Sequence, residues 1–245
     1  MSDTNDRAEN GMWTEHSSKQ YDLDLEAIRS QVLLMGGLIE KQFREAMAAF
    51  LSGDIVRAEK VIRGDEEINR LEVALDGACS QLIVRRQPAA NDLRTVMATS
   101  KVITDLERIG DEITKIARSG RDMQSRNTLI INNFQSIKVI GDHAGGMLHD
   151  ALDAFARKDR DLAIKLMGMD KVIDHEFHEM MRSLITYMTD EPQTIAPALD
   201  ILWAAKAIER VGDHSTNIAE YVIYVVEGRD IRHMDYMKMF PERPL

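Results

Sequence analysis

Apolar side chains recur along this chain at spacings of three and four residues, the pattern that amphipathic helices produce. The clearest series comprises Leu23, Ile28, Val32, Met35, Ile39, Phe43 and Met47. The pattern predicts six long helices, which end near residues 52, 84, 120, 157, 188 and 226. Helix-stopping and helix-starting signals separate them: Ser52-Gly53-Asp54, Gln87-Pro88, Lys158-Asp159, Glu191-Pro192 and Glu227-Gly228.

Turn-forming residues are scarce, since glycine (14) and proline (5) are few among 245 residues, and aromatic residues make up 5%. This composition disfavours a β-sandwich or barrel, which needs many turns and strand-forming side chains. Long helices with short connections predict an all-α protein with an antiparallel bundle architecture. We expect the polar residues 1–15 to form a disordered tail and residues 231–245 to form a loose C-terminal tail.

The two halves of the chain repeat each other. Residues 45–68 align without gaps to residues 150–173, at an offset of 105 positions. The motif Glu-Arg-X-Gly-Asp also occurs twice, at an offset of 102 positions. The sequence therefore predicts two tandem three-helix bundles related by internal duplication, over residues 16–120 and 121–230.

Charge and composition narrow the class of protein. The formal net charge is −10 and no basic cluster occurs, so a nucleic-acid partner is not expected. The single cysteine, Cys79, cannot form an internal disulfide. The polar start lacks the apolar segment of a signal peptide, and the longest apolar run, 221–226, is far shorter than a membrane span. We expect a cytoplasmic protein that reaches a membrane only through protein partners.

Each Glu-Arg-X-Gly-Asp motif places two carboxylates four positions apart within a predicted helix. Glu107 and Asp111 therefore share one helix face, as do Glu209 and Asp213, with Cβ atoms roughly 5–6 Å apart. The like charges cost roughly 0.2–0.5 kcal/mol, and the glycine between them costs about 1 kcal/mol relative to alanine. Because both unfavourable choices occur twice, we expect a further interaction to offset them.

The predicted helix preceding each motif adds another pair at the same spacing: Asp65 with Asn69, and Asp170 with Asp174. At about 100° per residue, the carboxylates of the motifs face away from the apolar stripe of their own helix, toward the surface. Hard oxygen ligands from two helices suit Mg, Ca, Mn or Fe ions. The pattern therefore predicts a cation site on the surface of each bundle.

Two other interpretations of the acidic pairs stay open at the level of sequence. One is a solvated acidic face, on which Arg108 and Arg210 only balance charge. The other is a carboxylate-bridged di-iron oxidase, although that class requires paired Glu-x-x-His motifs, which the chain lacks. No Gly-rich phosphate loop, Ser/His/Asp order or Cys-x-x-Cys motif occurs, so we expect a protein that is not an enzyme.

Further short motifs accompany the acidic pairs along the chain. They are His16-Ser17-Ser18, Met35-Gly36-Gly37, Asp65-Glu66-Glu67-Ile68-Asn69, Arg86-Gln87-Pro88 and Glu220-Tyr221-Val222-Ile223-Tyr224. Together with the repeated Glu-Arg-X-Gly-Asp, they resemble the PhoU family over residues 16–233, nearly the whole chain. The resemblance implies two three-helix bundles with multinuclear iron or zinc clusters on their surfaces, with magnesium or manganese as alternatives.

Carried over to this sequence, the resemblance assigns metal binding to Glu107, Asp111, Glu209, Asp213, Asp65, Asp170 and Asp174. Asn69 departs from the carboxylate pattern, and its amide oxygen is a weaker ligand, so we expect the two sites to differ in charge and occupancy. The resemblance also implies a homodimer that negatively regulates phosphate uptake and phosphate-starvation signalling. Such a regulator links the phosphate ABC transporter to a sensor histidine kinase.

Overall fold

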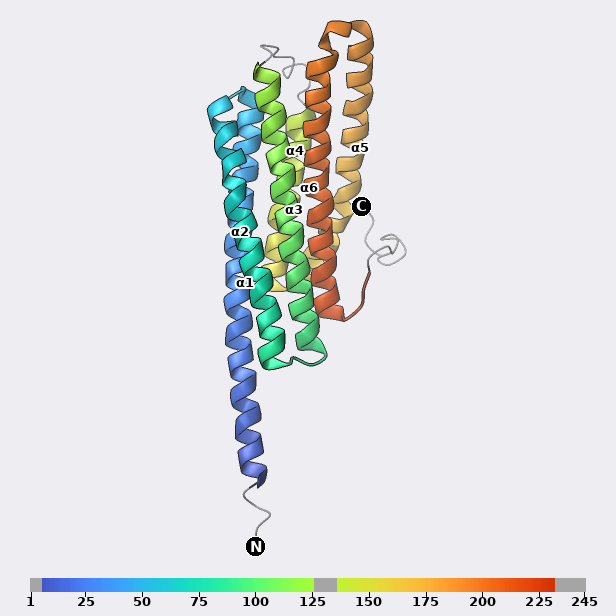
Figure 1. Ribbon diagram of the computed structural model, residues 1–245. Helices are drawn as coiled ribbons and strands as arrows, with labels where there is room; N and C mark the ends of the chain where they lie inside the picture. Colours follow the sequence, from blue (N-terminus) through green and yellow to red (C-terminus); the bar gives the residue numbers. More distant parts are fainter. Residues whose placement is uncertain (1–5, 126–135, 232–245) are drawn as a thin grey trace.

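The computed structural model describes residues 6–125 and 136–231, which form long helices joined by short connections (Figure 1). Over these ranges the elements are α1 (Asp6–Ser52), α2 (Ile55–Arg86), α3 (Asn91–Ser125), α4 (Ser136–Arg157), α5 (Arg160–Asp190), the short 3-10 helix η2 (Pro192–Thr194) and α6 (Ile195–Glu227). The same ranges contain no strand, which confirms the all-α prediction. None of these helices combines the length and the apolar character needed to cross a membrane.

The helices form two three-helix bundles that share one core. α1, α2 and α3 pack together, and α4, α5 and α6 do the same. The most extensive contact between any two of these helices joins α3 to α6, which lie side by side at the centre of the molecule (Figure 1). Buried residues of both halves, such as Ile109 and Val211, belong to one continuous apolar cluster. The predicted pair of tandem bundles is confirmed, with a broad interface between them.

The repeat is visible in the turns that open the second helix of each half. The Asp54 side chain accepts a hydrogen bond at 2.9 Å from the third backbone N–H after it, and Asp159 accepts the equivalent bond at 3.0 Å. Each of these N-caps follows a residue with positive φ, Gly53 at 69° and Lys158 at 54°. An N-cap of this kind contributes about 1 kcal/mol, so the equivalent turns are stabilised in the same way.

Two helix boundaries differ from the prediction. α1 begins at Asp6, so residues 6–15 lie in a helix and not in a disordered tail. Residues 6–15 contain no proline and one glycine, so nothing there stops a helix that continues from the packed part of α1. α3 continues past Gly120, where an added Cβ would lie 3.0 Å from the Phe50 Cα. Gly120 therefore serves the close packing of α3 on α1 and does not end the helix.

Three expected features lie wholly or partly outside the described residues. These are the first five residues of the chain, the expected start of the fourth helix at residue 128, and the C-terminal tail beyond Ile231. Within the described part, α4 begins at Ser136 and α6 ends at Glu227. Gly228 has the predicted left-handed conformation at the end of α6, with φ at 71°.

The glycine of each Glu-Arg-X-Gly-Asp motif allows a neighbouring helix to approach closely. A Cβ added at Gly110 of α3 would lie 3.1 and 3.2 Å from side-chain carbons of Ile68 on α2. At the equivalent Gly212 of α6, it would lie 3.1 Å from the Ile173 side chain on α5. Ile68 and Ile173 are equivalent in the repeat and both are buried. Helix packing therefore offsets the cost of the glycine in both halves.

Replacing Gly110 with leucine should destabilise the protein by about 1–3 kcal/mol, because the larger side chain must displace Ile68. In the double variant with Ile68→Ala, which frees that space, the loss should be smaller than the sum of the two single losses. Urea unfolding followed by circular dichroism measures these losses. The control is Gly77→Leu, since an added Cβ at Gly77 meets nothing within 4 Å. Strictly additive losses at positions 68 and 110 would contradict the assigned contact.

Candidate metal-binding site

The predicted ligands of the first half come together between α2 and α3. Asp65 lies on α2, and Glu107 and Asp111 lie one turn apart on α3. Burial raises the pKa of Glu107, and the charges of Asp111, Glu72 and Asp65 raise it further. These four carboxylates are the first cluster. Glu72 was not predicted, although its place seven positions after Asp65 puts it on the same face of α2.

Asp65 is the member of the first cluster that α2 contributes next to Asn69. Burial raises the pKa of its carboxyl group, and the charge of Asp111 raises it further. The Asn69 side-chain amide donates to its Oδ2 at 3.3 Å. Its Oδ1 is buried, and a side-chain hydrogen bond with Thr114 partly lowers the pKa of the carboxyl group. A buried carboxylate that its neighbours compensate only in part is costly, so a cation placed here would be stabilising.

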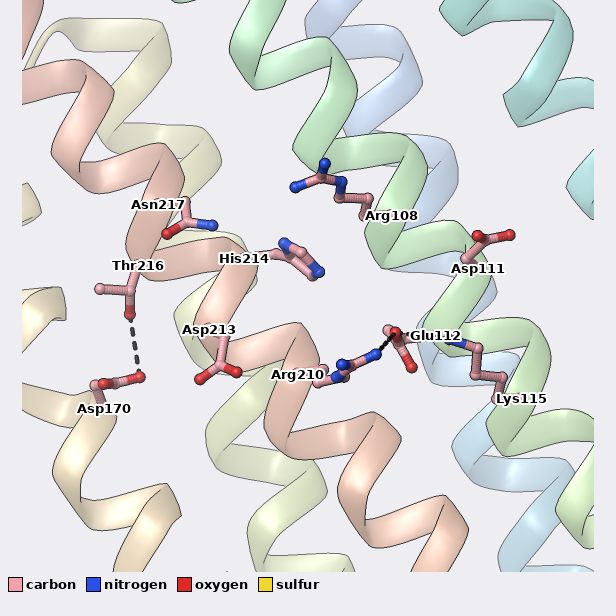
Figure 2. Close-up of a pocket in the computed structure, with 10 residues that line it drawn as sticks. All are labelled: Arg108, Asp111, Glu112, Lys115, Asp170, Arg210, Asp213, His214, Thr216 and Asn217. Carbon is pink, nitrogen blue, oxygen red and sulfur yellow. Dashed lines mark hydrogen bonds and ion pairs between the residues drawn. The ribbon is translucent and has the colours of Figure 1, made fainter. Parts of the chain in front are cut away.

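The second cluster occupies the equivalent place between α5 and α6, and comprises Asp170, Asp174, Glu209 and Asp213. Burial raises the pKa of Asp213 to about 6, with a further contribution from the charge of Glu209. Burial and the charge of Asp174 likewise raise the pKa of Asp170. Figure 2 shows Thr216 of α6 reaching Asp170 of α5, a hydrogen bond of 3.3 Å, with Asp213 beside them. The structure thus gathers the predicted ligands into one cluster in each half.

Glu209 departs from the expected exposed acidic face. It is only 8% exposed, and its two carboxylate oxygens accept hydrogen bonds from the Lys206 ammonium at 2.6 and 2.5 Å. Lys206 also lies over the ring of Phe177, 5.4 Å from its centroid. In the first half, Thr104 and Glu72 take the places of Lys206 and Phe177. The second cluster therefore contains a cation of its own. Each cluster has four carboxylates, but the fourth is Glu72 in the first half and Asp174 in the second, where the first half has Asn69.

The donor chemistry of the clusters fits a hard cation. Carboxylate oxygens are the ligands that Mg, Ca, Mn and Fe ions accept, and the buried Oδ1 of Asp65 is one of them. Among the side chains that the structure describes, however, no three from His, Cys, Asp and Glu converge closely enough to hold one ion. Binding therefore requires the carboxylates to rotate toward each other. Burial raises the pKa of Glu107 and of Asp213, and the mutual repulsion of the carboxylates raises it further. That repulsion opposes the rotation until a cation compensates it.

The arginines of the two motifs lie at the interface between α3 and α6. A cavity of about 650 Å³ lies there, and Figure 2 shows Arg108 of α3 and Arg210 of α6 among the side chains that line it. Arg210 pairs with Glu112 of α3 at 3.2 Å, and Lys115 binds the same carboxylate at 2.8 Å. Since Glu112 is only 4% exposed, the Arg210 pair joins the two halves instead of balancing the acidic pair of its own motif.

A second buried carboxylate, Asp105 of α3, binds α6 in the same interface. Asp105 is 2% exposed, and its Oδ1 lies 2.7 Å from His214 Nδ1 and accepts a hydrogen bond from the Asn217 amide at 3.1 Å. His214 therefore faces Asp105 although it adjoins Asp213 in the sequence. Neither Asp105 nor Glu112 was predicted. Their spacing of seven positions, which places both on one face of α3, was the available signal.

Asp213 should make the stability of the metal-free protein depend on pH. Its pKa of about 6 in the folded protein exceeds the ordinary value of 3.8, so folding favours its protonated form. Stability should therefore decrease as the pH rises from 3.8 to about 6. At pH 7, Asp213→Asn should unfold at a higher urea concentration than the unmodified protein, and this difference should fade toward pH 4. Glu67→Gln, exposed on α2 outside the clusters, is the control, and equal effects of the two substitutions would contradict the prediction.

The chain matches the family model described as the PhoU domain twice, over residues 32–120 and 137–222. A phosphate-specific transport system accessory protein PhoU homolog from Pseudomonas putida is 44% identical to it, over 94% of this chain and 89% of that protein. The accessory protein PhoU of Escherichia coli K12 is also 44% identical, over 89% of this chain and 90% of that protein.

Two crystal structures resemble this fold closely. PhoU from Pseudomonas aeruginosa superimposes with a TM-score of 0.83 at 42% identity, over 85% of this chain and all of that one (100%). The phosphate transport system regulatory protein PhoU from Streptococcus pneumoniae gives a TM-score of 0.80 at 28% identity, over 86% of this chain and 98% of that one. The sequence matches and the shared fold together place this chain in the PhoU family.

Proposed function

We propose that this protein is a metal-binding, non-enzymatic regulator of phosphate uptake. The relatives from Pseudomonas putida and Escherichia coli are named as accessory proteins of a phosphate-specific transport system. The protein from Streptococcus pneumoniae is described as a regulatory protein of phosphate transport. One observation carries the metal-binding part of the proposal: three carboxylates gather at equivalent helix positions in each half, Asp65, Glu107 and Asp111 in the first and Asp170, Glu209 and Asp213 in the second.

Each cluster has its own set of ligands. In the first half, Asp65, Glu107 and Asp111 would hold a cation, with Glu72 as an additional donor. In the second half, Asp170, Asp174 and Asp213 would hold a cation, because both carboxylate oxygens of Glu209 already accept hydrogen bonds from Lys206. Bound iron or zinc, or alternatively magnesium or manganese, would supply the positive charge that the clusters lack. A cation there would stabilise the contacts of α2 with α3 and of α5 with α6.

The regulator acts negatively and through protein partners in the cytoplasm. It binds subunits of the phosphate ABC transporter and a sensor histidine kinase, and so restrains phosphate uptake and phosphate-starvation genes. It works as a homodimer. The names of the relatives support the transport part of this assignment. They give no support to the alternative of a di-iron oxidase.

Metal analysis tests the ligand assignment. Protein purified without chelator should contain iron, zinc, magnesium or manganese, and the double variant Glu107→Gln, Asp111→Asn should bind that metal at least about tenfold more weakly. The expected loss follows from the removal of two charged donors, and helicity should be unchanged. The double variant Glu66→Gln, Glu67→Gln, which makes the same change of charge on the exposed face of α2, is the control. Equal metal content in the two variants would defeat the assignment.

Deletion of the gene tests the regulatory role. In a deletion strain supplied with ample phosphate, uptake of labelled phosphate and expression of phosphate-starvation genes should both rise, because the restraint is gone. The unmodified gene should restore the restraint. Unchanged uptake and expression in the deletion strain would refute the regulatory role. If the Glu107→Gln, Asp111→Asn variant restores full restraint, the regulation does not depend on metal in the first cluster.

A further inference from the structure

An open groove lies between α3 and α6 at the end of the interface where α6 begins. Its volume is about 610 Å³, and Trp203 of α6 stands at its edge with 62% of its surface exposed. Ile195 and Leu199 precede Trp203 at steps of four residues, and both are also exposed. The three side chains therefore form one apolar stripe along the surface of α6. We call this feature the Trp203 groove.

The internal repeat supplies a direct comparison, because the counterpart of Trp203 in α3 is Lys101, at the offset of 102 positions. At the opposite end of the interface, where α3 begins and α6 ends, the Lys101 ammonium lies over the rings of Tyr221 and Tyr224, at 5.5 and 5.9 Å from their centroids. Arg94 lies over the Tyr224 ring as well, at 5.6 Å. Aromatic rings of α6 therefore cover this part of α3.

The Trp203 groove lacks this aromatic cover. The positions of α3 that correspond to Tyr221 and Tyr224 hold Ser119 and Asp122, and both line the groove. A hydroxymethyl and a carboxylate side chain cannot cover an indole ring as two phenol rings would. One end of the α3–α6 interface is thus closed by this chain's own aromatic residues, and the other is left open beside an exposed tryptophan.

Cationic side chains surround the Trp203 groove, although the protein as a whole is acidic. Lys115, Lys206 and Arg210 line it, with 48%, 43% and 52% of their side chains exposed. The carboxylates that pair with them, Glu112 and Glu209, are only 5% and 10% exposed. The positive groups therefore face solvent and their counter-charges lie beneath.

Three further charged residues line the groove, one cation and two carboxylates. Arg118 adds a further exposed cation on α3. Two carboxylates, Asp122 and Asp200, also line the groove, and Asp122 is paired with Arg121 at 2.9 Å. Four cations and three carboxylates line the groove, but Glu112 and the nearby Glu209 are buried, so cations predominate on the side that faces solvent and attract negatively charged groups.

We propose that the Trp203 groove docks a segment of a partner protein that presents an aromatic side chain flanked by carboxylates. The aromatic ring packs on Trp203, in the space that Tyr221 and Tyr224 fill at the counterpart. The flanking carboxylates pair with Arg118 and Lys115. Tryptophan and arginine are the residues that most often dominate binding energy at interfaces, and a cationic rim selects acidic partners. The groove shares Lys206 with the second cluster, because this side chain lines the groove and binds Glu209.

Site-specific crosslinking in the host tests the proposal on the full chain. Position 203 carries the photo-crosslinker p-benzoylphenylalanine in one strain, and position 73 carries it in another. Val73 is the matched control because it is also an exposed apolar residue (70%), on α2. After irradiation, mass spectrometry identifies the crosslinked peptides. We expect position 203 to crosslink to one predominant partner peptide, in which an aromatic residue lies between or beside acidic residues. The same peptide should not crosslink to position 73.

Charge reversal at the rim provides a second measurement. Arg118→Glu should lower the yield of that crosslink about tenfold, the loss typical of a residue that dominates an interface. Arg63→Glu, the same change at an exposed arginine of α2, should leave the yield unchanged. Unchanged yield with Arg118→Glu would overturn the proposal. So would crosslinks from position 203 to a second copy of this chain, to this chain's own C-terminal segment, or to a peptide without aromatic and acidic residues. Absence of any crosslink specific to position 203 would also overturn it.

Discussion

The packing of α3 against α6 is the contact on which the rest of the molecule depends. The two helices run antiparallel, so that Lys101 near the start of α3 meets Tyr221 near the end of α6, and Glu112 meets Arg210. Between these points, Asp105 is buried against His214. A buried carboxylate that loses its partner costs about 3–5 kcal/mol, so these pairs hold the helices in one register.

This register also positions the acidic clusters. One face of α3 and one face of α6 form the interface between the halves. Another face of α3 packs on α2 at the first cluster, and another face of α6 packs on α5 at the second. Gly110 and Gly212 bring those neighbouring helices close enough for Asp65 and Asp170 to join the carboxylates of the motif. Apolar packing beneath these carboxylates holds them close together although their charges repel. Burial and this mutual repulsion together raise the pKa of Glu107 and of Asp213.

Duplication has left the two halves with the same backbone plan and different side chains at corresponding positions. Thr104 in one cluster corresponds to Lys206 in the other, which removes part of the negative charge. Lys101 under two tyrosines corresponds to Trp203 beside an open groove. The chain therefore presents two related but chemically distinct ends.

The sequence by itself determined the helices, their number and the repeat, because periodicity and capping are local properties of a chain. The N-cap at Asp54 and the break at Lys158-Asp159 follow from the local sequence, and the shared face of Glu107 and Asp111 follows from their spacing. Only the tertiary structure decided that Glu209 is buried under Lys206. It also decided that Glu72 joins the first cluster and that Asp105 reaches His214 across 109 positions. Helical periodicity predicts which residues share a helix face. Which other helix contacts that face depends on how helices distant in the sequence pack together. The charge, burial and pKa of each carboxylate depend on that partner.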